Sequence, residues 1–263
     1  MGSATREALA KAVVTLNAQA KVDLATGEQL FAAALLVDGS PQLAAALSDD
    51  TALESDRKGI VDQLFANYTV AGRSVLETLS TARWSSESDL IAGIEELAIR
   101  AVAESAPKTT SIEDELFSFA RTVSSNSELE LALGSRLGAA DGKVSLIHAL
   151  LDGKASEQSI AILGALVAQP RGRRIGELIR YATSIVADQA NLSIATVTVA
   201  RAVDAKQLSR LVDALSEQNG RPVRVQQVVD PSIVGGMRVQ IGDEVIDGSV
   251  SSRLADLRLR LVS

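Results

Sequence analysis

The fold of the C-terminal part of this chain is decided by the stretch Val228-Val229-Asp230-Pro231-Ser232-Ile233-Val234-Gly235-Gly236-Met237-Arg238-Val239-Gln240-Ile241-Gly242-Asp243-Glu244-Val245-Ile246-Asp247-Gly248-Ser249-Val250-Ser251-Ser252-Arg253-Leu254. Its Asp-Pro pair is a turn signal. Apolar residues then alternate with Arg238 and Gln240, which is the period of a strand with one buried face. Gly242 and Asp243 suit a two-residue hairpin loop, because glycine adopts a positive φ without penalty. The stretch therefore predicts a turn, a strand, a hairpin, a short strand ended by Gly248, and a helix capped by Ser249.

The residues just before this stretch predict the rest of a small domain. Residues 194–199 are rich in Val, Thr and Ile, which is typical of a strand. Asp204 with Gln207 begins a helix, and Val223 to Val229 alternate as a second strand. Leu254, Leu257 and Leu261 are expected to line a closing helix. The order β-α-β-β-β-α predicts a small α/β domain with a mixed sheet at residues 193–263.

Helical periodicity dominates everything before residue 190, so the fold class is mainly α. Residues 1–106 predict a first bundle of six helices, with start signals at Thr26/Gln29, Ser40-Pro41 and Ser86/Asp89. The sixth helix, which begins near Leu90, leads into Ala106-Pro107-Lys108-Thr109-Thr110, a candidate linker.

The apolar pattern then starts again, which indicates an internal duplication. Gln29-Leu30-Phe31 recurs as the similar triplet Glu115-Leu116-Phe117, 86 residues later. The offset stays at 86 or 87 through five helices. Residues 111–190 are therefore expected to form a second, partial helical copy, with the sixth helix as the candidate for its missing first helix. The alternative is two unrelated sets of amphipathic helices that fall into phase.

Composition excludes several classes of protein. The chain has 263 residues, 46% hydrophobic and 22% charged, and no Cys, which excludes disulfides and thiolate metal sites. The net charge is −7, distributed as −8 before residue 193 and +1 after it. An acidic body with 3% aromatic residues disfavours nucleic acid as a partner. The sequence contains no run of 18 apolar residues, so no membrane span is predicted, and the N-terminus shows no signal-peptide core.

Motifs that carry catalysis are missing. Lys143 and Lys154 each follow a Gly, but a phosphate loop needs Ser or Thr next, so both are interpreted as surface lysines at helix junctions. His148, the only His, has no partner for a zinc site or a catalytic pair. The basic run 169–174 suits either an anion and acidic partner or a solvated interhelical loop. Trp84 suits a buried anchor or a partner contact.

The opening stretch resembles the C-terminal part of the δ subunit of F-type ATP synthase, the family that includes the oligomycin-sensitivity-conferring protein. The likeness lies in the order and spacing of Asp, Val-Gly-Gly, the alternating strand, Gly-Asp, Val-Ile-Asp-Gly-Ser-Val and Arg-Leu. The matching positions, which we interpret as structural, are Asp230, Gly235, Gly236, Gly242, Asp247, Gly248 and Arg253. A usual member has one six-helix bundle, so this chain resembles a long form. Its second copy looks like the later helices of the usual bundle, and the first copy resembles it less.

The resemblance implies a non-catalytic subunit of the peripheral stalk, with no cofactor and no metal. The helical region would grip the N-terminal helices of α subunits, and the C-terminal domain would hold the C-terminal ends of b subunits. Membrane association, at the cytoplasmic face of the cell membrane, would come only through the complex. Family members bind in a groove between the first and fifth helices, and the matching positions are Val13, Leu16, Leu76 and Leu79, or Ile162 and Leu166 in the second copy. The alternatives are a helical-repeat adaptor for unrelated peptides, or an enzyme whose site is scattered along the sequence.

Overall fold

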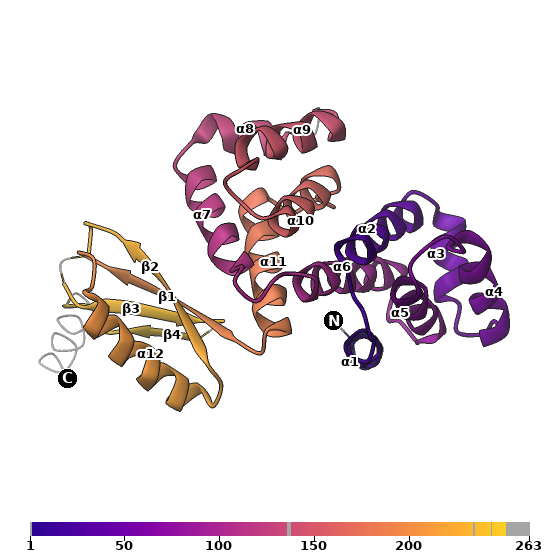
Figure 1. Cartoon of the computed structure of the whole chain (residues 1–263), viewed down its shortest axis with the longest axis horizontal. Helices are drawn as coiled ribbons and strands as arrows, with labels where there is room; N and C mark the ends of the chain where they lie inside the picture. Colours follow the sequence, from indigo (N-terminus) through magenta and orange to yellow (C-terminus); the bar gives the residue numbers. More distant parts are fainter. Residues whose placement is uncertain (1, 136–137, 234, 243, 251–263) are drawn as a thin grey trace, which may run out of the picture. The chain divides into compact units, whose positions relative to one another are not determined.

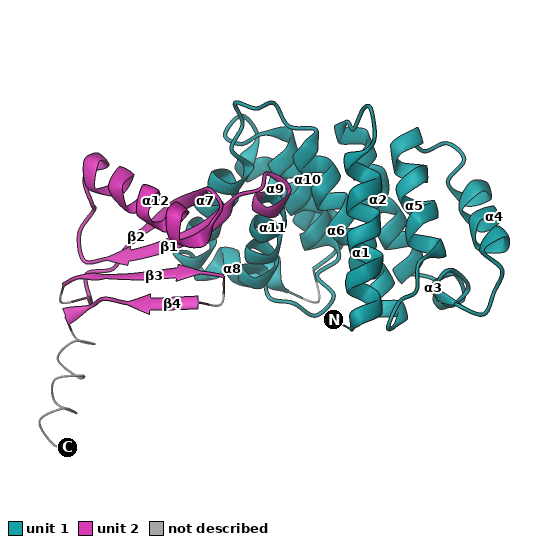
Figure 2. Cartoon of the chain, turned by 90° about the horizontal axis from the view of Figure 1, so that it is seen from below, with its two compact units in different colours: residues 1–186 teal, residues 187–263 magenta. Residues whose placement is uncertain are grey.

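The computed structural model describes residues 2–135, 138–233, 235–242 and 244–250. The chain forms two compact units, residues 1–186 and 187–263 (Figures 1 and 2). The predicted change from helices to strands near residue 191 lies close to this boundary. The predicted division of the helical region differs, because residues 1–106 and 111–186 belong to one unit.

The first unit is built from eleven helices among the described residues, the last of which extends three residues past the boundary. The first six are α1 (Ser3–Asn17), α2 (Leu24–Asp38), α3 (Pro41–Ser48), α4 (Glu54–Leu64), α5 (Val70–Thr81) and α6 (Glu87–Glu104). The next five are α7 (Ile112–Ser124), α8 (Ser127–Gly134), α9 (Ala140–Leu151), α10 (Glu157–Ala168) and α11 (Ile175–Gln189).

Two hydrophobic clusters lie in this unit, and α6 contributes to both. Leu90, Ile94 and Leu97 belong to the first cluster, with helices α1 to α5. Ile99 and Val102 belong to the second, with helices α7 to α11. A helix with apolar residues all round is buried on all sides, and every residue from 97 to 102 of α6 is buried. The sixth helix therefore packs in both helical sets, as expected if it also supplies the first helix that the second copy lacks.

The same packing motif occurs in both sets of helices. Gln29 Oε1 on α2 accepts a hydrogen bond from the backbone N–H of Thr69, the N-cap of α5, at 2.7 Å. Glu115 Oε2 on α7 accepts one from the N–H of Ser156, the N-cap of α10, at 3.0 Å. The acceptors are 86 residues apart and the donors 87, which is the offset predicted from the apolar pattern. The recurrence of a specific long-range hydrogen bond supports the duplication that we propose.

Helix starts follow local chemistry, with one correction. Ser40, Ser86 and Asp204 cap their helices as predicted. The predicted cap at Thr26 is wrong, because Asp23 accepts the hydrogen bond from the Thr26 N–H at 3.1 Å and α2 begins at Leu24. An aspartate three residues earlier competes better for the free N–H groups of the first turn. Gln29 is thereby left to bind Thr69.

The second unit is the predicted small α/β domain. It contains β1 (Ser193–Val199), α12 (Ala205–Asn219), β2 (Val223–Val229), β3 (Met237–Ile241) and β4 (Glu244–Asp247). The sheet order is β2-β1-β3-β4, with β1 and β2 parallel and the other pairs antiparallel. Leu215 of α12 packs with Ala195, Val197 and Val239 in a third cluster. The mixed sheet is confirmed, and the predicted closing helix at Leu254 to Leu261 lies outside the described residues.

Candidate partner-binding faces

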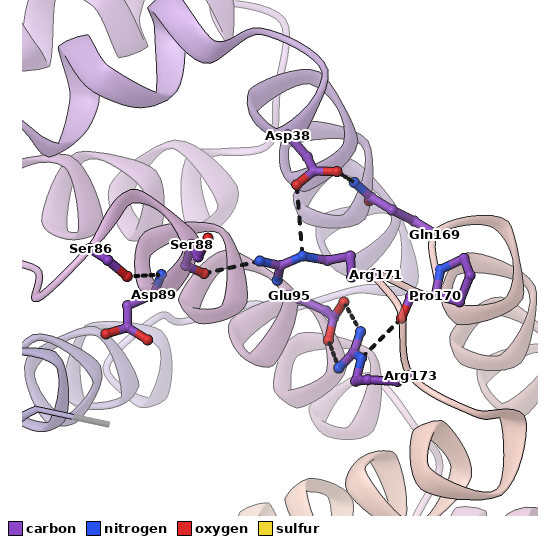
Figure 3. Close-up of polar contacts among 9 residues, drawn as sticks. All are labelled: Asp38, Ser86, Ser88, Asp89, Glu95, Gln169, Pro170, Arg171 and Arg173. Atoms are coloured by element: carbon purple, nitrogen blue, oxygen red, sulfur yellow. Dashed lines mark hydrogen bonds and ion pairs between the residues drawn. The ribbon is translucent and has the colours of Figure 1, made fainter.

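The loop between α10 and α11 holds the two helical sets together (Figure 3). Gln169 Nε2 donates to Asp38 Oδ2 at the end of α2, at 2.6 Å. Arg171 Nε lies 3.7 Å from Asp38 Oδ1, and its guanidinium donates to the Ser88 carbonyl at 3.1 Å. Arg171 also has a φ of 48°, a conformation that costs energy for a residue with a side chain. These contacts fix the loop on the first helical set.

The central contact of this loop is the ion pair between Arg173 and Glu95, which we call the clamp. Two guanidinium nitrogens of Arg173 donate to the two carboxylate oxygens of Glu95, both at 2.7 Å. The Glu95 side chain is only 6% exposed, so this is a bidentate pair in a desolvated place. Arg173 also lies over the Tyr181 ring, 5.1 Å from its centroid, at the distance of a cation–π contact. Burial raises the pKa of the Tyr181 hydroxyl, and the nearby Glu95 and Glu96 charges raise it further.

Two of the three arginines in the basic run 169–174 therefore bind carboxylates of this chain. Arg171 pairs with Asp38 and Arg173 pairs with Glu95, whereas the Arg174 side chain is exposed. Trp84 is the buried anchor that the sequence offered as one alternative: it is 7% exposed, and its Nε1–H donates to the Leu79 carbonyl at 2.8 Å. His148 is exposed on α9. Among the described residues no group of carboxylates and His could hold a metal ion.

The six apolar residues predicted to line a groove lie mostly in the core. Leu16, Leu76, Leu79, Ile162 and Leu166 are between 0% and 3% exposed, and Val13 is half-buried. Their spacing correctly indicated helix faces that are buried, but those faces are covered by this chain itself. Any partner that binds between α1 and α5 contacts the residues outside them.

The seam between α1 and α5 is open and is lined by small side chains. At one end a cavity of about 360 Å³ is bordered by Ala4, Ala8, Lys11 and Ala82, with Ser3, Glu7 and Arg83. Farther along, the Thr15 and Thr78 hydroxyls lie 3.2 Å apart, and Gln19 Nε2 donates to Ser74 Oγ at 3.4 Å. Val14 of α1 is 68% exposed. Small residues let another helix approach closely, and an exposed valine gives it an apolar contact.

The equivalent seam in the second set, between α6 and α10, is covered by α2. Leu24 and Phe31 of α2 pack against the second hydrophobic cluster. A Cβ on Gly27 would lie 2.3 Å from Val102 Cγ2 and 2.9 Å from the Val102 backbone nitrogen, so α2 and α6 are in very close contact there. Because α2 also belongs to the first core, it cannot leave without unfolding the first set. The second set therefore offers no open seam at this position.

In the second unit, the predicted structural residues tie the two ends of the β3–β4 hairpin together. Gly236 has a φ of 81°, and a Cβ there would lie 2.4 Å from the Gly248 carbonyl oxygen. The Gly248 N–H donates to the Met237 carbonyl at 2.9 Å, and the Val250 N–H donates to the Gly235 carbonyl at 3.0 Å. Only glycine allows this approach. Gly242, with a φ of 57°, makes the hairpin turn as predicted.

The two aspartates of the stretch hold turns. Asp230 Oδ1 accepts from the Ser232 N–H and Asp247 Oδ1 from the Ser249 N–H, each at 2.9 Å. These hydrogen bonds with Ser232 and Ser249 lower the pKa of each carboxyl, because they favour the charged form. Arg253 lies outside the described residues.

One rim of the second unit is apolar and exposed. Val245 and Ile246 are 43% and 41% exposed on β4, which is an edge strand. Ile246 also borders a cavity of about 100 Å³, together with Leu215 and Ile241 and the end of α12. Edge strands and apolar rims of this kind are common places for a partner segment to bind.

Comparison with known families assigns the chain to a family. A family model described as ATP synthase delta (OSCP) subunit matches residues 96–261 of the chain. The chain belongs to this family. The match begins inside α6 and covers the second helical set and the small α/β domain.

Relatives of the δ family extend the likeness to the first set as well. The chain is 48% identical over 262 residues to an ATP synthase subunit delta from Leifsonia xyli subsp. xyli, covering 99% of both chains. It is 39% identical to another from Acidothermus cellulolyticus, covering 100% of both. A chain in a structure of the Toxoplasma gondii mitochondrial ATP synthase hexamer is 20% identical, with a TM-score of 0.42, covering 64% of this chain and 96% of that one.

Proposed function

We propose that this chain is a non-catalytic subunit of the peripheral stalk of F-type ATP synthase. It links the head of α and β subunits to the b subunits and resists the torque of rotation during proton-driven ATP synthesis. The observation that carries this proposal is the 48% identity, over the full length, to an ATP synthase subunit delta. Both helical sets lie within that alignment, so this relative has a chain of the same extended length, with both sets.

The α subunit's N-terminal helix binds the seam between α1 and α5 of the first set. That seam is open and has small side chains, and α1 also carries the exposed Val14. The corresponding seam of the second set is filled by α2. One chain therefore holds one α helix by this mode, although it carries two helical sets.

The C-terminal ends of the b subunits bind the second unit, at the apolar rim formed by Val245 and Ile246. This unit has its own hydrophobic core, so it can hold a partner independently of the helical unit. The complex brings the chain to the cytoplasmic face of the cell membrane. Within the described residues no single helix is long and apolar enough to cross a membrane, and only the pair α2 and α3, bent by 106°, reaches that length together.

Affinity purification of the tagged chain from solubilised membranes tests the proposal. We expect the α and b subunits to be recovered together with the chain. Recovery of the folded chain without either of them would overturn the assignment to the stalk.

Paired surface substitutions test the site for α. Ala4→Asp should weaken binding of a synthetic α N-terminal helix at least tenfold, because it places a bulkier, charged side chain at the cavity between α1 and α5. Leu53→Asp is the matched control, since Leu53 is 69% exposed and lies on the N-cap of α4, away from the seam. Equal affinity of both variants and the unmodified chain would contradict binding at the α1–α5 seam.

A further inference from the structure

A cavity of about 1200 Å³ lies in the second helical set, where α8 and the start of α9 face the α10–α11 loop. Its wall includes Leu131, Lys143, Arg174 and Ile175, and also Ser127, Glu130, Gly134, Ser135, Gly138, Ala140, Ala168, Pro170, Gly172 and Arg173. Three of these side chains are cationic and one is anionic. The cavity therefore carries a net positive charge in a unit that is acidic as a whole.

Lys143 is the unusual residue in this wall. The sequence predicted a surface lysine, and this is wrong, because Lys143 is only 7% exposed. Within the described part of the chain, no carboxylate lies within ion-pair distance of its ammonium group. The Nζ itself still reaches solvent at the cavity wall, so an anion that enters the cavity can pair with it. Glu130, the one carboxylate in the wall, does not do so.

Arg174 adds a second cation that is available to a ligand. Its backbone contacts Glu177, but its guanidinium has no partner among the described residues, and the side chain is exposed. Arg173, in contrast, is neutralised by Glu95. The cavity thus offers two free positive charges next to Leu131, which is 73% exposed.

The first helical set shows that this cavity is not a general consequence of the fold. The corresponding place, one offset of 86 or 87 residues earlier, is bordered by Ser48, Trp84 and Ser86–Ser88 and encloses about 500 Å³. There the Trp84 ring packs on α6, so closely that a Cβ on Gly93 would lie 2.4 Å from it. The second set has Pro170 and Arg171 where the first has Trp84. The first copy narrows the space with its own indole, and its counterpart of Lys143, Arg57, donates to the Ser80 carbonyl at 2.8 Å. The second copy leaves the larger cavity, and Lys143 has no such hydrogen bond among the described residues.

We propose that this cavity binds an acidic segment of another subunit in the assembled complex. A carboxylate of that segment lies between Lys143 and Arg174, and an adjacent apolar side chain rests on Leu131 and Ile175. The volume is too large for a single small anion and suits a stretch of peptide. This inference rests on the proposed function, because it takes the partner from the stalk complex. It adds a contact on the helical unit that is separate from the α1–α5 seam.

Zero-length carbodiimide cross-linking of the purified complex, followed by mass spectrometry, tests the inference. Lys143 should be joined to an Asp or Glu of another subunit, and raising the salt concentration before the reaction should lower the yield. Lys154, whose Nζ donates to its own Leu150 carbonyl on an exposed surface, is the control. If the complex is intact but Lys143 is joined only to this chain, as to Glu130, the inference fails while the proposed function stands.

A binding measurement distinguishes a peptide from a simple anion. In complexes reassembled with a chain carrying Lys143→Met and Arg174→Gln, we expect at least a tenfold faster loss of the chain on dilution than with Lys154→Met. Circular dichroism of each variant checks that the helical unit is folded. Equal retention of both variants would overturn the proposal of a peptide site. So would a second result: inorganic phosphate, added to the isolated chain, protects Lys143 from an amine-modifying reagent as well as assembly into the complex does.

Discussion

The clamp between Arg173 and Glu95 is predicted to be the most sensitive polar contact of the helical unit. Replacing Arg173 with Met keeps an aliphatic side chain in place but leaves the Glu95 carboxylate, 6% exposed, without its partner. Removing one member of a buried ion pair costs about 3–5 kcal/mol. The Arg173 side chain is 26% exposed, so water compensates in part, and we expect a loss near the lower end, about 3 kcal/mol.

The assay is thermal and urea unfolding of the full chain, monitored by circular dichroism. For a unit of this size, about 3 kcal/mol corresponds to a fall of about 6–12 °C in Tm. Arg173→Met combined with Glu95→Gln should recover more than half of the loss, because no charge is then left buried.

The matched control is Arg171→Ala in the same loop. Its ion pair with Asp38 is longer, at 3.7 Å, and the Asp38 side chain is 37% exposed. Loss of this ion pair should cost about 0–1 kcal/mol, and loss of the Arg171 hydrogen bond to the Ser88 carbonyl about 0.5–1.5 kcal/mol, which together stay below the loss expected for Arg173→Met. If Arg173→Met destabilised the chain no more than Arg171→Ala, or if the double variant were the least stable of all, the clamp would not hold the two helical sets together.

Three further outcomes follow from the same structure. Gly236→Val should destabilise the second unit alone, by about 1–3 kcal/mol, because the side chain meets the Gly248 carbonyl and φ is positive; an equal shift in the helical unit's unfolding transition would contradict this. Raising the pH above about 10 should lower stability, since the unfolded tyrosine ionises first while burial raises the pKa of the folded Tyr181, and Tyr181→Phe should lessen the loss in urea titrations between about pH 9 and 11. A chain cut after residue 191 keeps α11 whole and should stay folded and bind α but not b, as judged by heat unfolding and co-purification.

The local elements could be predicted because each depends on neighbours in sequence. Alternation over Met237 to Ile241 predicted β3, and Gly242 predicted its hairpin. The order β2-β1-β3-β4 was not predicted in detail, but mixed pairing followed from a helix between the first two strands and a tight turn between the last two. The Thr26 error shows the limit of such patterns, since a second acceptor three residues earlier decides the cap.

The partner-binding residues could not be predicted in the same way, and the reason is physical. A stripe such as Leu16, Leu76 and Leu79 shows that a helix face is buried, but not whether this chain or another one buries it. The residues that remain open at the α1–α5 seam are mostly Ala and Thr, which have no strong periodic signal. Lys143 was also missed, because its burial depends on how α8 and α9 pack rather than on its neighbours in sequence.

The shared helix α6 explains how a duplicated bundle can serve as part of a stalk. If each copy had its own first helix, a linker would join them, and torque could bend the chain at that point. Instead one continuous helix of 18 residues supplies Leu97 to the first core and Ile99 to the second. Bending between the copies then requires breaking α6 or separating Arg173 from Glu95. Sharing α6 also places α2 over the α6–α10 seam, so the arrangement that stiffens the unit also closes that seam and leaves the α1–α5 seam as the site that we propose for the α helix.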